Sequence, residues 1–229
     1  MKTQKDLNKK RIVLTGGGTA GHVIPQLAII PKLKSQNWQI LYIGTNNIEK
    51  TLVEKENIDF ATISAGKLRR YFSFKNFFDI LKTISGIITS LKLIYKYKPN
   101  IIFSKGGFVS FPVCFAAFLL KKPVITHESD LSPGLANKMI ALISTKILYA
   151  FPETKKYLPI EKSFLTGIPI RSDLKDGNID RGINICGLTP QKNKPIILIM
   201  GGSQGATNIN NFVIKNIALL TKSYQIIHI

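Results

Sequence analysis

The sequence predicts an α/β fold with one complete doubly wound domain and the first part of a second one. Short runs rich in Ile, Val, Leu and Phe alternate with longer helix-like stretches, a pattern typical of parallel sheets covered by helices. Two glycine-rich turns, Thr15 to Pro25 and Met200 to Asn210, each follow an apolar run and lead into a helix-like stretch. Such turns direct backbone N–H groups and a helix N-terminus toward one place, which favours phosphate binding.

The first domain is predicted to span residues 1–165. Strands are expected at 11–15, 39–44, 59–63, 100–104, 123–126 and 145–149. Helices are expected at 23–36, 48–56, 74–97, 111–120 and 133–143. Because strands and helices alternate along the chain, these elements predict one parallel sheet with helices on both faces.

The second domain is predicted to span residues 166–229. Three prolines interrupt a Lys-rich segment between Ala150 and Leu174, which we interpret as a crossing between domains. After it the pattern predicts a strand at 195–200, a helix near 206–220 and a strand that begins at Tyr224. Two strands and one helix cannot cover both faces of a sheet, so this region is expected to be an incomplete domain.

Composition and charge limit the functional classes. With 229 residues, 45% of them hydrophobic, the chain can bury a core. Its net charge of +19 indicates either a polyanionic partner or a Lys-rich proteome. Cys114 and Cys186 have no metal or disulfide spacing, which fits a reducing cytoplasm. The N-terminus is polar, and the longest apolar run, 111–120, is too short to span a bilayer. We therefore predict that the chain is neither secreted nor transmembrane.

The first glycine turn formally satisfies the GxGxxG pattern through Gly16, Gly18 and Gly21, which makes a dinucleotide-dependent oxidoreductase one alternative. Two features disfavour it. The second strand runs into Gly44 without the acidic residue that would hold a ribose. The turn also ends in His22, an ionisable imidazole that a hydride-transfer site does not need.

Two histidines follow predicted strands and are expected near the carboxyl edge of the sheet, where ligands bind in open α/β folds. His22 is able to accept a proton from a sugar hydroxyl near neutral pH, or it merely caps the helix. His127 stands beside Glu128 and Asp130 and could line the same crevice. For His127 we favour a structural role, in which a neighbouring carboxylate fixes the imidazole.

Further phosphate-binding candidates lie in loops. Gly106 and Gly107 form a third glycine turn, which either approaches a pyrophosphate or is only a tight turn. Arg171 and Ser203 are expected to face the cleft from the side of the second domain, and Arg171 could bind a phosphate through two hydrogen bonds. The chain contains no DxD motif and no metal-ligand spacing, so we expect a site without a metal.

The segment from Lys67 to Pro99 combines a basic cluster with a long predicted helix. One apolar stripe is expected to face the core: Phe74, Phe77, Phe78, Leu81, Ser85, Ile88, Leu91 and Tyr95. The start of the segment resembles an interfacial membrane patch of Phe72, Phe74, Phe77 and Phe78, rimmed by Lys67, Arg69, Arg70, Lys75 and Lys82. We therefore expect contact with an anionic membrane surface at this end.

Six segments, taken in order, resemble the MurG family of peripheral membrane N-acetylglucosaminyltransferases of peptidoglycan synthesis. They are TGGGTAGHVIP, GKLRRYFSF, SKGGFVSFP, THESDLSPGLANK, TGIPIR and MGGSQGATNIN. The resemblance implies a GT-B architecture, with an acceptor- and membrane-binding N-terminal domain at the cytoplasmic face of the cell membrane. It also implies transfer of N-acetylglucosamine, with inversion, from UDP-N-acetylglucosamine to the C4 hydroxyl of the muramoyl sugar of undecaprenyl-linked lipid I. No cofactor is implied.

The same resemblance implies roles for single residues. His22 becomes the candidate base. The implied donor contacts are Thr19, Ala20, Gly21, Arg171, Ser203 and Asp130, and the implied acceptor pyrophosphate loops contain Gly17, Gly18, Gly106 and Gly107. Asp130 and Ile168 depart from the Asn that family members often carry. The family's uracil pocket lies beyond Ile229, so we expect the 229-residue chain alone to be inactive.

Alternatives remain open at this point. One is a non-enzymatic remnant that associates with membranes and binds acceptor lipid or partner proteins. Another is a related glycolipid glycosyltransferase. Nucleic-acid binding is compatible with the charge, but the sequence contains no recognition module with basic and aromatic residues at suitable spacing, and we predict none.

Overall fold

The structure is a computed structural model that describes residues 10–67, 74–189, 191, 193–202 and 205–229. The chain divides into two compact units, Met1–Ser172 and Asp173–Ile229. The first unit ends shortly after the boundary expected at residue 165, because the segment up to Leu165 adds a strand to its sheet.

The first unit contains a seven-stranded sheet in which every pairing is parallel. The strands are β1 (Arg11–Thr15), β2 (Gln39–Gly44), β3 (Asp59–Thr62), β4 (Ile101–Ser104), β5 (Val124–Glu128), β6 (Lys146–Tyr149) and β7 (Ser163–Leu165). Their order is β3-β2-β1-β4-β5-β6-β7, so the direction of winding reverses between β1 and β4. The predicted α/β class and the first six strands are confirmed. The segment that contains β7 was interpreted as an interdomain crossing, which is wrong because β7 pairs with β6 in the first sheet. The sequence did not show this strand, since three residues are too few to display a two-residue period.

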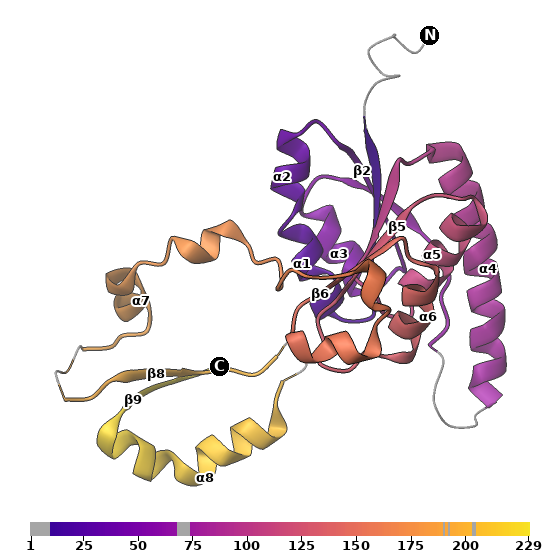
Figure 1. Cartoon of the computed structure of the whole chain (residues 1–229). Helices are drawn as coiled ribbons and strands as arrows, with labels where there is room; N and C mark the ends of the chain where they lie inside the picture. The colour runs from indigo at the N-terminus through magenta and orange to yellow at the C-terminus, as the bar shows by residue number, and fades with distance from the viewer. Residues whose placement is uncertain (1–9, 68–73, 190, 192, 203–204) are drawn as a thin grey trace. The chain divides into compact units, whose positions relative to one another are not determined.

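Helices cover both faces of the sheet, with α1 to α3 on one face and α4 to α6 on the other (Figure 1). The α-helices are α1 (Ile24–Leu27), α2 (Ile30–Ser35), α3 (Ile48–Glu54), α4 (Phe74–Tyr97), α5 (Ser110–Leu119) and α6 (Leu135–Ile143). The 3-10 helices are η2 (Ala20–His22), η3 (Pro152–Tyr157), η4 (Ile160–Lys162) and η5 (Ser172–Lys175). The helix expected at 23–36 is split, because Pro31 has no N–H with which to continue the ladder of α1.

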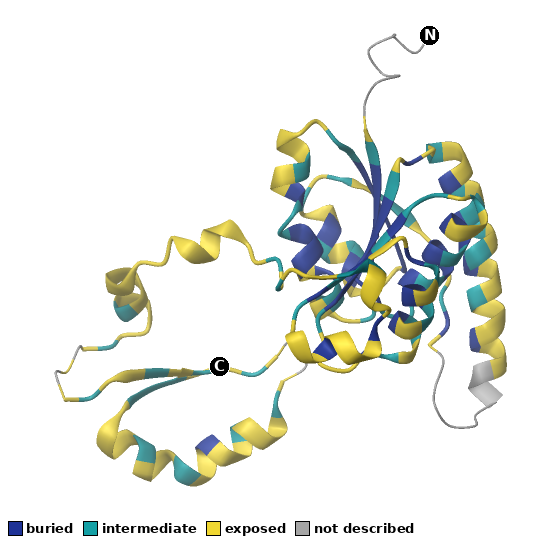
Figure 2. Cartoon of the chain, in the orientation of Figure 1, coloured by how far each residue is buried: buried dark blue, intermediate teal, exposed yellow. Residues whose placement is uncertain are grey.

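The core has two layers, one on each face of the sheet (Figure 2). Successive residues of β1 supply them alternately, since Val13 packs toward α4 and α5 while Ile12 and Leu14 pack toward α1 and α2. This alternation follows from the two-residue period of a strand. Because both faces of the sheet are packed, the loops at its carboxyl edge are attached to a rigid base.

The apolar stripe of α4 that was expected to face the core is largely exposed, so that prediction is wrong. Phe77 and Phe78 are 64% and 63% exposed, and Tyr95 is 73% exposed. The helix instead packs through Gly86 and Ser90, both of which are buried. A Cβ atom at Gly86 would collide with the carbonyl oxygen of Ser64, so a close approach of the backbones selects the buried face. Because α4 carries apolar residues on more than one side, the helical spacing of its apolar residues did not indicate which side is buried.

The second unit contains α7 (Ile179–Ile185), β8 (Ile196–Ile199), α8 (Thr207–Ser223) and β9 (Gln225–His228). β8 and β9 pair in parallel, so the predicted strand, helix and strand are confirmed. The short helix α7 was not predicted. The side chain of Asn178 caps it by accepting a hydrogen bond of 2.8 Å from the Arg181 N–H.

Candidate active site at the carboxyl edge of the sheet

Two glycine turns meet where the strand order reverses. The turn of residues 16–18 follows β1, and the turn of Gly106 and Gly107 follows the adjacent strand β4. A Cβ atom at Gly107 would lie 2.6 Å from the carbonyl oxygen of Gly17 and 3.2 Å from Cδ2 of His22. Thus the two turns and His22 contact one another at the topological switch point, where open α/β folds bind ligands.

His22 is the last residue of η2, and its ring is held by one side chain. Nδ1 lies 2.8 Å from Oγ1 of Thr19. When Nδ1–H donates to this hydroxyl, the lone pair of Nε2 is free to accept a proton. Burial and then the charge of Lys105 lower the pKa of His22, against an opposing effect of Asp130. His22 is therefore a neutral imidazole at neutral pH, as a general base must be.

Lys105 is a buried lysine at the same edge that the sequence analysis missed. It directly follows β4, is 1% exposed, and donates from Nζ to Oγ of Ser129 at 2.7 Å. Burial lowers the pKa of Lys105, whereas Glu128 and Asp130 raise it. The signal in the sequence was a charged residue placed directly after an apolar strand, where the sheet edge meets the loops.

The glycine N–H groups of these turns are largely occupied by protein side chains. Three donate within the first unit: Gly18 to Oε2 of Glu49 at 3.5 Å, Gly106 to Oγ of Ser104 at 3.1 Å, and Gly107 to Oδ1 of Asn137 at 2.9 Å. By contrast, no described residue accepts a hydrogen bond from the N–H groups of Thr19, Ala20 or Gly21. The N–H groups of η2 and of the residue before it therefore remain available to an anion.

Two buried polar side chains support the turns and were also missed. Glu49 of α3 accepts hydrogen bonds from both the N–H and the hydroxyl of Thr45. Asn137 of α6 donates to Oε2 of Glu128 at 2.6 Å while it accepts from Gly107. Each connects a glycine turn to a neighbouring element, so the turns are held in place before any ligand binds.

His127 is fixed in a different way from the one expected. Its Nε2–H donates to the carbonyl oxygen of Gly167 at 2.8 Å, and Nδ1 is buried with no partner in the described part of the chain. The carboxylate of Glu128 instead accepts from the N–H of Asp130 and from Asn137. The expectation that a neighbouring carboxylate orients His127 is therefore wrong. Burial lowers the pKa of His127 to about 4.

The family model described as the glycosyltransferase family 28 N-terminal domain matches residues 12–149, which contain both glycine turns of the first unit and His22. The chain belongs to glycosyltransferase family 28. The matched residues include strands β1 to β6 and all the residues described above as contacts of His22.

Individual family 28 relatives support the resemblance to MurG sequences. The UDP-N-acetylglucosamine--N-acetylmuramyl-(pentapeptide) pyrophosphoryl-undecaprenol N-acetylglucosamine transferase of Clostridium tetani is 53% identical over 96% of this chain and 62% of its own length. The protein of the same name from Clostridium novyi is 50% identical over 97% of this chain and 62% of its own length. The resemblance is confirmed, and the chain spans about 62% of the length of these relatives.

Solved structures confirm the fold. MurG of Acinetobacter baumannii superposes with a TM-score of 0.68 at 23% identity, covering 96% of this chain and 66% of that one. The UDP-GlcNAc 2-epimerase of Neisseria meningitidis, solved with UDP-GlcNAc bound, gives a TM-score of 0.64 at 17% identity, covering 96% and 64%. At these identities the likeness establishes the GT-B-type fold of this family 28 chain and nothing finer.

Of the other predicted site residues, one lies at the same edge as His22, one is exposed elsewhere in the first unit, and one is outside the described residues. Asp130 is exposed and its charge acts on both His22 and Lys105, which brings it to the same edge. Arg171 is exposed and falls within the first compact unit. Ser203 lies outside the described residues. The donor-binding roles of these three residues stay predictions.

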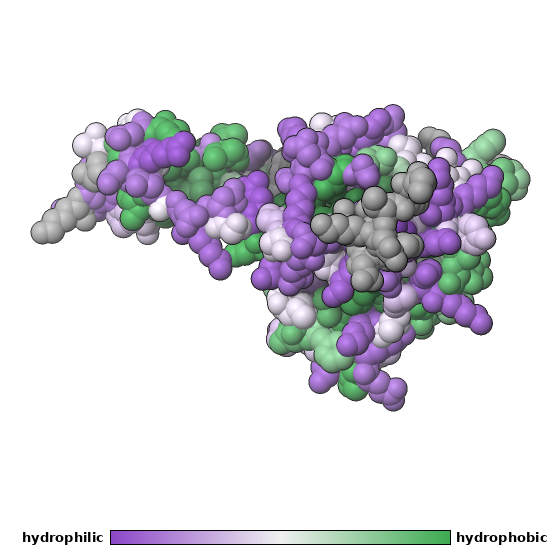
Figure 3. All heavy atoms as spheres, turned by 90° about the horizontal axis from the view of Figure 1, so that it is seen from above, coloured by the Kyte–Doolittle hydropathy of each residue, from purple (hydrophilic) through white to green (hydrophobic). Residues whose placement is uncertain are grey.

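The predicted membrane patch is described only in part. Arg69, Arg70 and Phe72 lie outside the described residues, as do the side chains of Phe74 and Lys75. Lys67, Phe77 and Phe78 are exposed, and the two rings pack edge to face with centroids 5.9 Å apart. Hydrophobic residues reach the surface on the side of the first unit that carries α4 (Figure 3). Among the described helices, none is both long and apolar enough to cross a bilayer.

Proposed function

We propose that this chain forms the acceptor side of a transferase that moves N-acetylglucosamine from UDP-N-acetylglucosamine to the C4 hydroxyl of the muramoyl sugar of lipid I. The 53% identity to the Clostridium tetani transferase over 96% of the chain carries the proposal. The neutral imidazole of His22 at the meeting point of two glycine turns supports it chemically.

The proposed reaction assigns each group a task. Nε2 of His22 accepts the proton of the acceptor hydroxyl as its oxygen attacks the anomeric carbon of the donor sugar. The bond from that carbon to the diphosphate breaks, and UDP leaves with the electron pair, so the configuration inverts. Thr19 holds the tautomer of His22, and the N–H groups of Thr19, Ala20 and Gly21, which have no acceptor among the described residues, stabilise the negative charge that develops on the departing UDP.

We further propose that the protein works as a peripheral protein at the cytoplasmic face of the membrane. The exposed aromatic residues near the start of α4, Phe77 and Phe78, belong to the same segment as the exposed Lys67 and Lys82, in a chain with net charge +19. Exposed aromatics rimmed by cations are typical of segments that insert among anionic headgroups. The same face supports the second candidate, a membrane-associating protein without catalysis.

A chimera tests the proposal. The part of the Clostridium tetani relative that aligns with this chain is replaced by this chain, and lipid II formation from lipid I and UDP-N-acetylglucosamine is followed by mass spectrometry. We expect turnover in the chimera and none in the 229-residue chain alone. A folded but inactive chimera beside an active relative would contradict the transferase. Salt-dependent sedimentation with anionic vesicles, and none with DNA, is the expected result for the membrane surface.

A further inference from the structure

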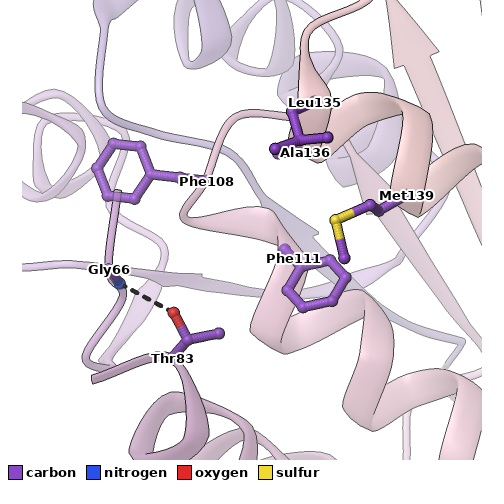
Figure 4. Close-up of a pocket in the computed structure, with 7 residues that line it drawn as sticks. All are labelled: Gly66, Thr83, Phe108, Phe111, Leu135, Ala136 and Met139. Carbon is purple, nitrogen blue, oxygen red and sulfur yellow. Dashed lines mark hydrogen bonds between the residues drawn. The ribbon is translucent and has the colours of Figure 1, made fainter. Parts of the chain in front are cut away.

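Two of the pockets in the described part of the first unit are lined by α4, and they differ in volume and in their polar groups. The pocket between α4, α5 and α6 has a volume of only about 40 Å³ (Figure 4). The Gly66 N–H on its wall donates to Oγ1 of Thr83 at 3.3 Å, and that hydroxyl donates to the carbonyl oxygen of Asp79 at 2.8 Å. This pocket is therefore too small for an organic ligand, and these polar groups already bond to the protein.

The second pocket lies at the amino end of the sheet, where β1 begins and α4 ends. Its volume is about 420 Å³, which is typical of sites for small organic ligands. It is lined by residues of β1, β2, β3 and α4: Arg11, Gln39, Leu41, Ala61, Leu93, Lys96 and Tyr97. Arg11 is the first residue of β1, so roughly 13 Å of strand separates it from the glycine turn that precedes His22. The second pocket is thus separate from the candidate active site.

Arg11 supplies a fixed positive charge to this pocket. Its Nε–H donates to Oε1 of Gln39 at 3.0 Å, and Nη1 donates to the carbonyl oxygen of Tyr97 at 3.0 Å. The guanidinium also lies 5.9 Å from the centre of the Tyr97 ring. These contacts hold the half-buried side chain but use only two of the five N–H donors of a guanidinium. Because no described carboxylate forms an ion pair with Arg11, the remaining donors favour an anion from outside the chain.

The hydroxyl of Tyr97 is a second donor in the pocket wall. Its oxygen is buried and has no hydrogen-bond partner in the part of the chain that the structure describes. Burial and then the charge of Asp59 raise the pKa of Tyr97 to about 12, against an opposing effect of Arg11. The hydroxyl therefore keeps its proton at neutral pH. Since a buried hydroxyl without a partner is unfavourable, the site favours a ligand that accepts a hydrogen bond from it.

The rest of the wall and the local charge narrow the class of ligand. Three of the lining residues are apolar and suit a hydrocarbon body: Leu41, Ala61 and Leu93. The charges of the lining residues Arg11 and Lys96, together with that of the nearby Asp59, sum to one positive charge. A carboxylate carries one negative charge, whereas a phosphate monoester carries about 1.5 to 2 at neutral pH. The charge balance therefore favours a carboxylate.

We propose that this pocket is a binding site for a small organic carboxylate with an apolar body. The carboxylate accepts hydrogen bonds from the guanidinium of Arg11 and from the hydroxyl of Tyr97. The apolar body lies against Leu41, Ala61 and Leu93. The inference goes beyond the proposed function, because the pocket shares no residue with the candidate active site and its ligand takes no part in the sugar transfer.

NMR titration of the 229-residue chain with naphthoate tests the site, with neutral naphthamide and with naphthyl phosphate as matched probes. We expect naphthoate to bind at least about tenfold more tightly than naphthamide, because a hydrogen bond to a charged group is worth more than the roughly 1.4 kcal/mol that equals tenfold. The largest amide shifts should lie in β1, β2 and the end of α4. Equal affinity of naphthoate and naphthamide would overturn the site, as would tighter binding of naphthyl phosphate.

Tyr97→Phe removes only the hydroxyl and separates binding from folding. Because that hydroxyl has no partner in the described chain, the variant should resist urea at least as well as the unsubstituted chain. It should nevertheless bind naphthoate about fivefold more weakly. Tyr95→Phe, on the same helix at a side chain that is 73% exposed, is the matched control and should change neither property. Reduced stability of Tyr97→Phe, or an unchanged affinity, would overturn the proposal.

Two further variants test the sign of the ligand's charge. Arg11→Gln should remove the preference for naphthoate over naphthamide. Asp59→Asn removes a negative charge near the pocket and should strengthen naphthoate binding about two- to fivefold. Asp59 is exposed at the start of β3, so this variant should fold even where Arg11→Gln does not. Weaker naphthoate binding in Asp59→Asn would contradict an anion site, while the transferase proposal is tested separately by the chimera.

Discussion

His22 and His127 lie at the same edge of the sheet, but His22 ends the 3-10 helix η2 whereas His127 is part of strand β5. The sequence places both after predicted strands, but β5 extends to Glu128 and includes His127; burial lowers the pKa of both histidines. The ring of His22 is held by the side chain of Thr19 and is partly exposed. The ring of His127 is buried and donates to a backbone carbonyl, that of Gly167.

The difference shows which observation separates a reactive imidazole from a structural one. A hydrogen bond to backbone connects His127 at the end of β5 to the segment after β7, so it stabilises the first unit. A hydrogen bond to one hydroxyl within the same turn fixes the tautomer of His22 and leaves its second nitrogen available. In the sequence both residues stand after an apolar run, so that pattern alone does not distinguish them.

The largest effect is expected from His22→Gln in the active chimera. Loss of a general base typically lowers the rate by about 100- to 10,000-fold, and the amide cannot accept the proton. The free energy of unfolding should stay nearly unchanged, because the half-buried ring of His22 has one side-chain hydrogen bond, to Thr19 of its own turn, among the described residues. Rate is measured as lipid II formed, and stability by urea unfolding. Full activity in this variant would exclude His22 as the base.

For His127 the expected effect is on stability and its pH dependence. The pKa of His127 is about 4 in the folded chain and 6.5 when exposed, so between these values the unfolded state binds more protons. The free energy of unfolding should therefore fall as pH decreases from 6.5 to 4, by up to roughly 3 kcal/mol from this group. His127→Asn removes the titration, and urea unfolding across this range should show a flatter curve. An unchanged slope would contradict the buried neutral imidazole.

The sequence predicted the elements of the sheet well because their signals are local. The apolar runs of β1 to β6 and the glycine turns stand out without knowledge of what packs on them. The buried face of α4 could not be predicted in this way, since the backbone of Ser64, which belongs to another segment, approaches Gly86 closely. Period counting assumes that the most apolar stripe is buried, and here it is exposed.

Of the candidate site, the sequence predicted His22 and the glycine turns but not their supports. Glu49 and Asn137 are ordinary surface-type residues in a helical pattern, and only the fold shows that they hold the N–H groups of Gly18 and Gly107. Lys105 was overlooked because a lysine in a basic chain carries little information. Lys105 stands out only because it is buried, and its burial is known from the structure and not from the sequence.

A smaller effect on the rate is expected from Lys105→Met. This variant tests whether the charge of Lys105 affects the pKa of His22 more than that of His127. Lys105 is the second cause of the lowered pKa of His22 and a lesser cause for His127. Its removal should raise the pKa of His22, so the acid limb of the rate profile moves to higher pH. Asp130→Asn removes the opposing charge and should move the limb to lower pH. NMR titration of the imidazole in the 229-residue chain measures both shifts, and equal directions would contradict the electrostatic account.

The smallest effect is expected from Thr19→Val, which removes the one hydroxyl that holds His22. A neutral hydrogen bond contributes about 1 kcal/mol, so the chimera should lose roughly fivefold in kcat, with little change in KM for either substrate. Thr19→Ser keeps the hydroxyl and should restore most of the rate, which a change of shape alone would not explain. If Thr19→Val were as damaging as His22→Gln, Thr19 would have to touch the reacting atoms itself. A fivefold loss would instead show that a side-chain partner only orients the base, just as the Gly167 carbonyl orients His127.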